Sequence, residues 1–211
     1  MKQIQHIVVL LVICFICTAN SHGQNDLTEK DKIELQQRVK LKVEEFQKYL
    51  SDIVNTELTE VRREESIQAA LDLFIGKGKS YTVENDYGET EYRNPVRIQV
   101  SSINNDRTRW LPLTKYLANQ YENVHKYGKV EIQSVDAVII DNIKKTGDGQ
   151  YQAVAYFCQK YISYRDGKLT YGPDITGKKV IVHISAIETP AGTVWDAKLG
   201  DIYVTSTKSD F

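Results

Sequence analysis

The stretch that decides the fold is Gln150–Tyr164, QYQAVAYFCQKYISY, which is rich in aromatic residues and contains neither glycine nor proline. Such a composition favours a β-strand, in which successive side chains point to opposite faces of a sheet. Both faces of this strand would be apolar. They carry Val154, Tyr156, Cys158, Ile162 and Tyr164 on one side and Ala153, Ala155, Phe157 and Tyr161 on the other. A sheet covered by helices on one face usually has polar residues on the other, so both faces are expected to contact protein.

Three further segments that follow Gly128 have a similar strand-like composition. They are Lys129–Asn142, Lys178–Glu188 and Val194–Thr205. Short links that contain glycine separate these segments from one another and from Gln150–Tyr164, which predicts an antiparallel meander. In the last segment the apolar positions change phase at Gly200-Asp201, which predicts a β-bulge that bends the sheet.

The N-terminal half is predicted to be helical. A long amphipathic helix is expected over Leu27–Asn55, because apolar residues recur there at steps of three and four. These residues are Val39, Val43, Phe46, Leu50 and Ile53. A second helix is expected over Glu60–Phe74, ended by Gly76, and a third is expected to begin at Pro112.

A hairpin is predicted between the second and third helices. Its strands would be Ser80–Glu84 and Glu91–Val100, joined by the turn-rich Asn85-Asp86-Tyr87-Gly88. The predicted fold class is therefore α+β, with three N-terminal helices and this hairpin packed on a curved antiparallel four-strand meander.

Residues 1–23 are interpreted as a secretory signal peptide, since Lys2 is followed by the apolar run Ile7–Cys17 and a short polar stretch. That run spans about 16 Å as a helix, roughly half of a bilayer core, so no stable membrane span is expected after cleavage. Lipid anchoring on Cys14 or Cys17 is the alternative, although each cysteine follows an isoleucine where a lipoprotein signal needs a small residue.

The mature chain, residues 24–211, is expected to be a single domain that is periplasmic or secreted. Cleavage would leave Cys158 as its only cysteine, so no internal disulfide can form. The chain has 27 Lys and Arg against 28 Asp and Glu, a net charge of -1, which argues against nucleic-acid binding.

No cofactor or metal site is predicted. The stretch Gly76–Ser80, GKGKS, matches only the end of a phosphate-binding loop, because Leu73 stands where that motif needs glycine and a helix precedes it. His125 and His183 lie far apart, and neither has a metal-ligating residue one helical turn away.

The order of the predicted elements, and the closing strand from Trp195 to Val204, resemble the family of nuclear transport factor 2, ketosteroid isomerase and several polyketide cyclases. The resemblance extends over about Lys32–Thr205 and includes no catalytic motif. It implies a cone in which a curved sheet wraps the long first helix and leaves a pocket at the open end. A cystatin-like grip is the competing fold, but its single long helix does not account for three helical segments.

That resemblance also implies the candidate site residues. An isomerase or dehydratase of this family needs a carboxylate or histidine base that faces a Tyr or a protonated acid in an apolar cavity. The weak pocket candidates are Tyr49, Asp136, Tyr156, His183 and Asp201. Cys158 working with His183 as a nucleophile is a further candidate, against which a small buried thiol beside a core histidine is the competing interpretation.

Two classes of function remain. The favoured one is an exported, non-enzymatic binding or interaction module whose partner is an unknown protein or small ligand. The alternative is a small-molecule isomerase or dehydratase that uses the cone pocket. A homodimer through the convex sheet face is also predicted; the competing interpretation is that the tyrosine rings of that face remain half-exposed to solvent. The turn at Arg165–Lys168, flanked by Tyr161, Tyr164 and Tyr171, is either a partner-recognition surface or a solvated hairpin tip.

Overall fold

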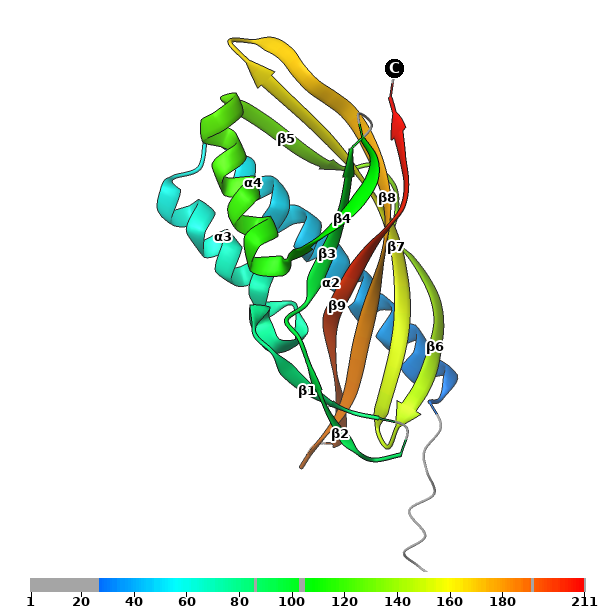
Figure 1. Cartoon of the computed structure of the whole chain (residues 1–211). Coiled ribbons are helices and arrows are strands. Elements are labelled where there is room, and N and C mark those ends of the chain that lie inside the picture. Colours follow the sequence, from blue (N-terminus) through cyan, green and yellow to red (C-terminus); the bar gives the residue numbers. More distant parts are fainter. Residues whose placement is uncertain (1–26, 86, 103–104, 191, 211) are drawn as a thin grey trace, which may run out of the picture.

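The computed structural model describes residues 27–85, 87–102, 105–190 and 192–210. Within these ranges three α-helices lie against one face of a seven-stranded sheet, and a two-stranded hairpin stands beside it (Figure 1). The predicted signal peptide lies outside the described residues. No described helix has both the length and the hydropathy of a membrane span.

The first described helix, α2 (Glu29–Val54), begins with a capping box. The Thr28 side chain accepts a hydrogen bond from the Asp31 N–H, and the Asp31 carboxylate accepts one from the Thr28 N–H. These bonds satisfy two donors that a helix start otherwise leaves open. The predicted apolar face is buried, with Val39, Val43, Phe46, Leu50 and Ile53 at most 1% exposed. The helix predicted over Leu27–Asn55 is therefore present, with slightly shorter ends.

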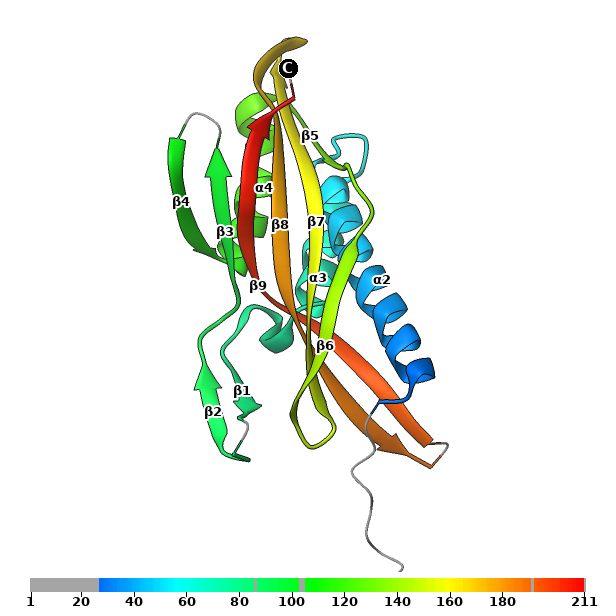
Figure 2. The same ribbon diagram turned by 90° about the vertical axis from the view of Figure 1, so that its right-hand side faces the viewer.

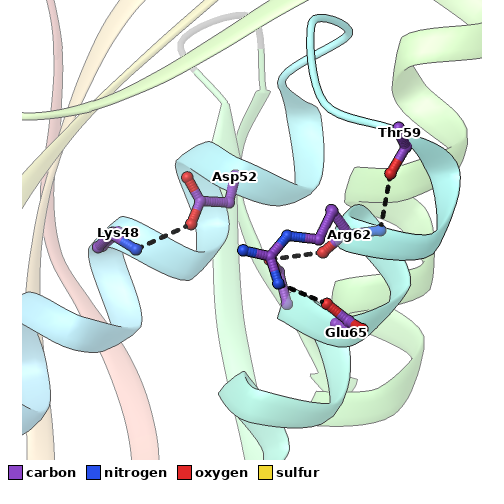
Figure 3. Close-up of polar contacts among 6 residues, drawn as sticks. Lys48, Asp52, Thr59, Arg62 and Glu65 are labelled. Atoms are coloured by element: carbon purple, nitrogen blue, oxygen red, sulfur yellow. Dashed lines mark hydrogen bonds and ion pairs between the residues drawn. The ribbon is translucent and has the colours of Figure 1, made fainter.

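Helix α3 (Glu60–Asp72) follows a tight turn. The Thr59 hydroxyl caps it by accepting a hydrogen bond from the Arg62 N–H, and exposed ion pairs surround the turn (Figure 3). Arg63 is only 4% exposed and donates to two carbonyls, that of Ile53 at 2.8 Å and that of Tyr121 at 3.2 Å. This one guanidinium thus connects the end of α2 to helix α4 (Leu113–Tyr127).

The predicted four-strand antiparallel meander is wrong. The described sheet has seven strands in the order β4-β3-β9-β8-β7-β5, with β6 also paired to β7. It is mixed, because β3 and β9 run parallel where Ile98 lies opposite Ile202. The strands are β3 (Arg97–Ser102), β4 (Asn105–Pro112), β5 (Lys129–Ser134), β6 (Ile139–Gly147), β7 (Gln150–Arg165), β8 (Lys168–Thr189) and β9 (Gly192–Ser209).

Two of the errors have local causes. The predicted strand Glu91–Val100 is interrupted at Asn94-Pro95, since proline has no N–H to donate to a ladder. Strand β2 (Thr90–Arg93) therefore ends there and pairs only with β1 (Tyr81–Glu84), whereas β3 joins the main sheet. Strand β4 was not expected at all, because its sequence is mostly polar.

The predicted strand Lys129–Asn142 is in fact two strands, β5 and β6. Both pair with β7, at different ends: Ile132 lies opposite Tyr161, and Ile140 lies opposite Ala155. Strand β7 is long enough to hold two successive partners along one edge, an arrangement that strand composition does not reveal.

The bulge predicted at Gly200-Asp201 is confirmed. Val180 pairs with Ile202 and Val182 with Leu199, so two residues of β9 lie opposite the single residue Ile181. In Figure 2 the sheet lies in front of the helices. We call the face of the sheet that packs on the helices the inner face. It contributes Ala153, Ala155, Val180, Val182, Ala197 and Leu199 to the core.

Candidate functional site

A pocket of about 1040 Å³ lies beyond the end of this core, on the inner face of the sheet. Helix α4 contributes Tyr116 and Gln120 to its lining, among others, and strands β3 and β4 contribute residues that include Val100 and Leu111. Strands β5, β7 and β8 complete the lining. We call this cavity the inner pocket.

The polar lining of the inner pocket follows from the alternation of β7 and β8. Along β8 the inner face carries Val182 and Val180, then Lys178, Thr176 and Asp174. On β7 the residues opposite the last three are Phe157, Gln159 and Tyr161. The inner face thus changes from apolar to polar partway along both strands, and the pocket begins where the side chains change.

Lys178 is buried in this pocket and is only 5% exposed. No carboxylate in the described part of the chain forms an ion pair with its ammonium, and the nearby contact is the Tyr116 ring, whose centroid is 5.3 Å from Nζ. Burial away from water disfavours the charged form, so it lowers the pKa of Lys178 to about 8.

Gln159 lies diagonally across from Lys178, because its partner on β8 is Thr176 and the partner of Lys178 is Phe157. It is also 5% exposed, and its Nε2 has no hydrogen-bond acceptor among the described residues. Diagonal neighbours on one sheet face are about 7–8 Å apart at Cα, within reach of long side chains. The pocket therefore holds two neighbouring donors for which the described residues supply no acceptor.

At the other end of the pocket, Asp174 is 3% exposed and accepts a hydrogen bond from the Tyr171 hydroxyl. The Tyr171 oxygen lies 2.5 Å from the Ser102 hydroxyl. Because the Tyr171 hydroxyl donates its only proton to Asp174, Ser102 must be the donor to Tyr171. The two hydroxyls thus form a hydrogen-bonded chain that ends at the Asp174 carboxylate. Asp174 and Lys178 are four steps apart along β8, about 13 Å.

Tyrosine rings form much of the wall between these two ends. Burial raises the pKa of both Tyr116 and Tyr161, and the neighbouring Tyr127 and Tyr171 raise that of Tyr161 further. Both phenols therefore stay protonated at any physiological pH. The exposed rim carries Arg107, Arg109, His125, Lys126 and one acid, Glu122.

None of the five predicted candidates lines the inner pocket. Two of them, His183 and Asp201, line a second pocket of about 720 Å³ between the β1–β2 hairpin and the opposite, outer face of the sheet, which we call the outer pocket. The Tyr81 ring lies 6.4 Å from the His183 ring at their centroids. Burial lowers the pKa of His183, Asp201 raises it, and Arg93 lowers it. Asp201 itself accepts a hydrogen bond of 2.8 Å from the Arg97 N–H.

The other three candidates are dispersed. Tyr49 packs on the core from α2, Tyr156 is 36% exposed on the outer face, and Asp136 is exposed between β5 and β6. Burial and a hydrogen bond with Asp136 raise the pKa of the Cys158 thiol. Cys158 lies opposite Gly177 and His183 opposite Gln152, so about 20 Å of strand separates thiol from imidazole and rules out a nucleophile pair.

Lys178, Gln159 and Asp174 were missed in the sequence, and Tyr161 and Tyr171 were functional candidates only as flanks of the Arg165–Lys168 turn. A usable signal exists at Lys178, which stands in phase with Val180, Val182 and Ile184 at the strand period of two. A lysine in an otherwise apolar row indicates a buried charge. Gln159 gives a similar signal, because it stands in phase with Ala153, Ala155, Phe157 and Tyr161. Asp174 gives none, because it lies outside the predicted strand Lys178–Glu188. Within the described ranges, no cluster of three His, Cys, Asp or Glu side chains could hold a metal ion.

Comparison with known proteins finds no family model and no curated protein that matches this chain.

Proposed function

We propose that this chain is an exported, non-enzymatic binding protein that holds a small molecule in the inner pocket. The observation that carries the proposal is the buried ammonium of Lys178, which faces a cavity of about 1040 Å³ and has no counterion among the described residues. A buried charge without a partner is costly, and ligand sites are where such groups are found. The cavity volume matches that of small-molecule sites, which are about 300–1,000 Å³.

The test is a thermal-shift screen of the purified chain against diverse metabolites. A ligand at 100 times its Kd adds about 2.7 kcal/mol to the free energy of unfolding, enough to be seen as a shift in Tm. Asn119→Trp, which fills the pocket from α4, should abolish the shift. Ala118→Trp places the same ring on the adjacent, exposed position of α4 and should leave it unchanged. If no compound binds, or if both variants bind equally, the proposal is wrong.

Membership in the nuclear transport factor 2-like superfamily is part of the proposal. Its support is the order of helices and hairpin, the long helix α2 under the inner face, and a pocket beside that helix layer. Export is supported by Lys2 and the apolar run Ile7–Cys17. Mass spectrometry of the N-terminus of the exported protein tests it, with Gln24 as the expected first residue.

The convex-face homodimer stays a prediction. It is supported by apolar side chains that remain accessible on the outer face and its β6 edge, where Tyr156 is 36% and Ile139 is 66% exposed. Light scattering at micromolar concentration tests it: a dimer that Tyr156→Lys converts to a monomer would support it, and a wild-type monomer would contradict it.

One observation favours the alternative function, an isomerase or dehydratase. Asp174 and Tyr171 pair a buried carboxylate with a phenol at the wall of a cavity, the combination that acid–base chemistry needs. Once a ligand is found, conversion of it by the wild type and its loss in Asp174→Asn, with binding retained, would establish an enzyme. If the ligand is chemically unchanged after prolonged incubation, the chain is a binding protein and not an enzyme for that ligand.

A further inference from the structure

We propose that the ligand of the inner pocket is an organic carboxylate, bound through the Lys178 ammonium and the Gln159 amide, with an apolar or aromatic body. The inference rests on the proposed function, since it assigns a chemical class to the ligand of the same pocket. It is carried by the Lys178 ammonium and the Gln159 amide, each on a side chain that is 5% exposed. Both groups are hydrogen-bond donors, and neither has an acceptor among the described residues.

The first step concerns the sign of the ligand's charge. An ammonium taken out of water needs an anion or several acceptors near it, and the described residues supply only the face of the Tyr116 ring. Gln159 adds an amide donor at a diagonal position of the same sheet face. Two donors beside each other, one of them charged, match the two oxygens of a carboxylate.

The second step concerns the magnitude of that charge. Lys178 provides a single positive charge in the buried part of the pocket, and the Asp174 carboxylate lies on the same strand at about 13 Å. A dianion such as a phosphate monoester would leave an uncompensated negative charge in this cavity. A monoanion is neutralised by the one ammonium that is present.

The third step concerns the rest of the ligand. Beside the donors the pocket is lined by Tyr116, Tyr161, Ile132, Leu111 and Val100. Aromatic and aliphatic walls of this kind favour an apolar body, because its burial releases water. At the rim, Arg109 and Lys126 are exposed and carry positive charge, which raises the local concentration of anions at the entrance.

The fourth step concerns pH. The ammonium is the binding form of Lys178, and its pKa in the unoccupied pocket is about 8. Below that pH the pocket is charged, and above it the amine becomes neutral. Carboxylate affinity should therefore be constant between pH 6 and 7.5 and fall by up to tenfold per pH unit above about 8.

The test is isothermal titration calorimetry of the full chain at pH 6.5 with matched acid and amide probes. The pairs are 4-phenylbutyrate with 4-phenylbutyramide and octanoate with octanamide, and phenyl phosphate is the dianion arm. In at least one pair the acid should bind at least ten times more tightly than its amide and than phenyl phosphate. The preference should decline above pH 8.

Variants assign the preference to Lys178. Lys178→Met should remove the difference between acid and amide while keeping the affinity for the amide. Lys178→Arg should keep the preference and lose its decline at high pH, since arginine stays charged. Lys179→Met, the next residue and on the outer face, is the matched control and should behave as wild type. Circular dichroism verifies that each variant is folded.

Several outcomes would overturn the inference. They are equal binding of acid and amide in both pairs, no binding of any acid, stronger binding of phenyl phosphate, or a preference that survives in Lys178→Met. If neutral compounds bind to the wild type and Asn119→Trp abolishes their binding, the inner pocket binds small molecules and only the assignment of a carboxylate ligand is wrong. A screen without any pocket ligand would reject the proposed function as well.

Discussion

The Lys178 ammonium lies 5.3 Å from the centroid of the Tyr116 ring, and within the described chain this cation–π contact is its one charge-stabilising interaction. Such a contact contributes about 2 kcal/mol when it is shielded from water, less than the cost of burying the charge. Lys178 therefore destabilises the unoccupied fold. The presence of a buried lysine that destabilises the fold is explained if its ammonium binds a ligand.

Lys178→Met is expected to stabilise the unliganded protein at pH 7. The pKa of Lys178 is about 8 in the folded chain and 10.5 without burial, so below pH 8 the fold bears the whole cost of the charge, about 3 kcal/mol. From pH 8 to 10 the unfolded chain binds more protons than the folded chain, and the wild type gains stability as the pH rises. Urea unfolding at pH 7 and pH 9.5 should show the advantage of the variant shrinking.

Lys179→Met serves as the control for this measurement. Lys179 is half-buried on the outer face of β8, the strand that also carries Lys178. Its Nζ lies 5.0 Å from the centroid of the Tyr203 ring. The variant should show no advantage that varies with pH. A Lys178→Met advantage of the same size at both pH values would show that packing, and not the buried charge, causes it.

The second prediction concerns the hydroxyl chain at the far end of the pocket. Tyr171→Phe removes the donor to the Asp174 carboxylate, which is 3% exposed, and should lower the free energy of unfolding by about 1–3 kcal/mol. Tyr164→Phe removes a hydroxyl from a half-buried tyrosine on the outer face and should cost less than about 0.5 kcal/mol. Equal costs in urea unfolding would mean that the Tyr171 hydroxyl does not stabilise the carboxylate.

The helices could be predicted from the sequence because their signal is local. Val39, Val43, Phe46 and Leu50 repeat with the helical period, and that period alone places them on one buried face. The predicted strand boundaries were wrong where they depend on pairing between strands that are distant in the sequence. Whether Lys129–Asn142 is one strand or two depends on β7, which holds both β5 and β6 along its length.

The site was harder to predict than the fold, for a related reason. Lys178, Gln159 and Asp174 meet in one pocket only through the register of β7 against β8, and register is set by pairing across the sheet. The candidates from the family resemblance, such as Asp136 and Tyr156, were chosen for their chemistry without knowledge of the face they occupy. Both lie outside the inner pocket.

The third prediction concerns the β-bulge. Gly200 packs so closely on β8 that a Cβ would lie 2.9 Å from the His183 Nε2 and 3.2 Å from the Ile181 carbonyl oxygen. Gly200→Ala should therefore lower the free energy of unfolding by about 1–3 kcal/mol through overpacking. Gly147→Ala is the control, because its Cβ would meet its nearest atom at 3.7 Å, an ordinary contact. A Gly200→Ala protein as stable as Gly147→Ala would mean that the bulge is not constrained by His183.

The fourth prediction concerns the outer pocket. Burial lowers the pKa of His183, so as the pH falls from 7 to 5 the unfolded chain takes up a proton before the folded chain does. The contribution to stability is then lost as the pH falls through this window. His183→Gln cannot take up that proton and should lose less stability between pH 7 and pH 5 than the wild type does. Urea midpoints at the two pH values measure the difference.

His125→Gln, on the exposed surface of α4, is the control and should follow the wild type. If His183→Gln loses as much stability on acidification as the wild type does, then His183 takes up its proton equally well in both states. The Asp201 carboxylate, which favours the imidazolium, would in that case outweigh the burial that disfavours it. The outer pocket would then be open enough to water for its histidine to titrate normally.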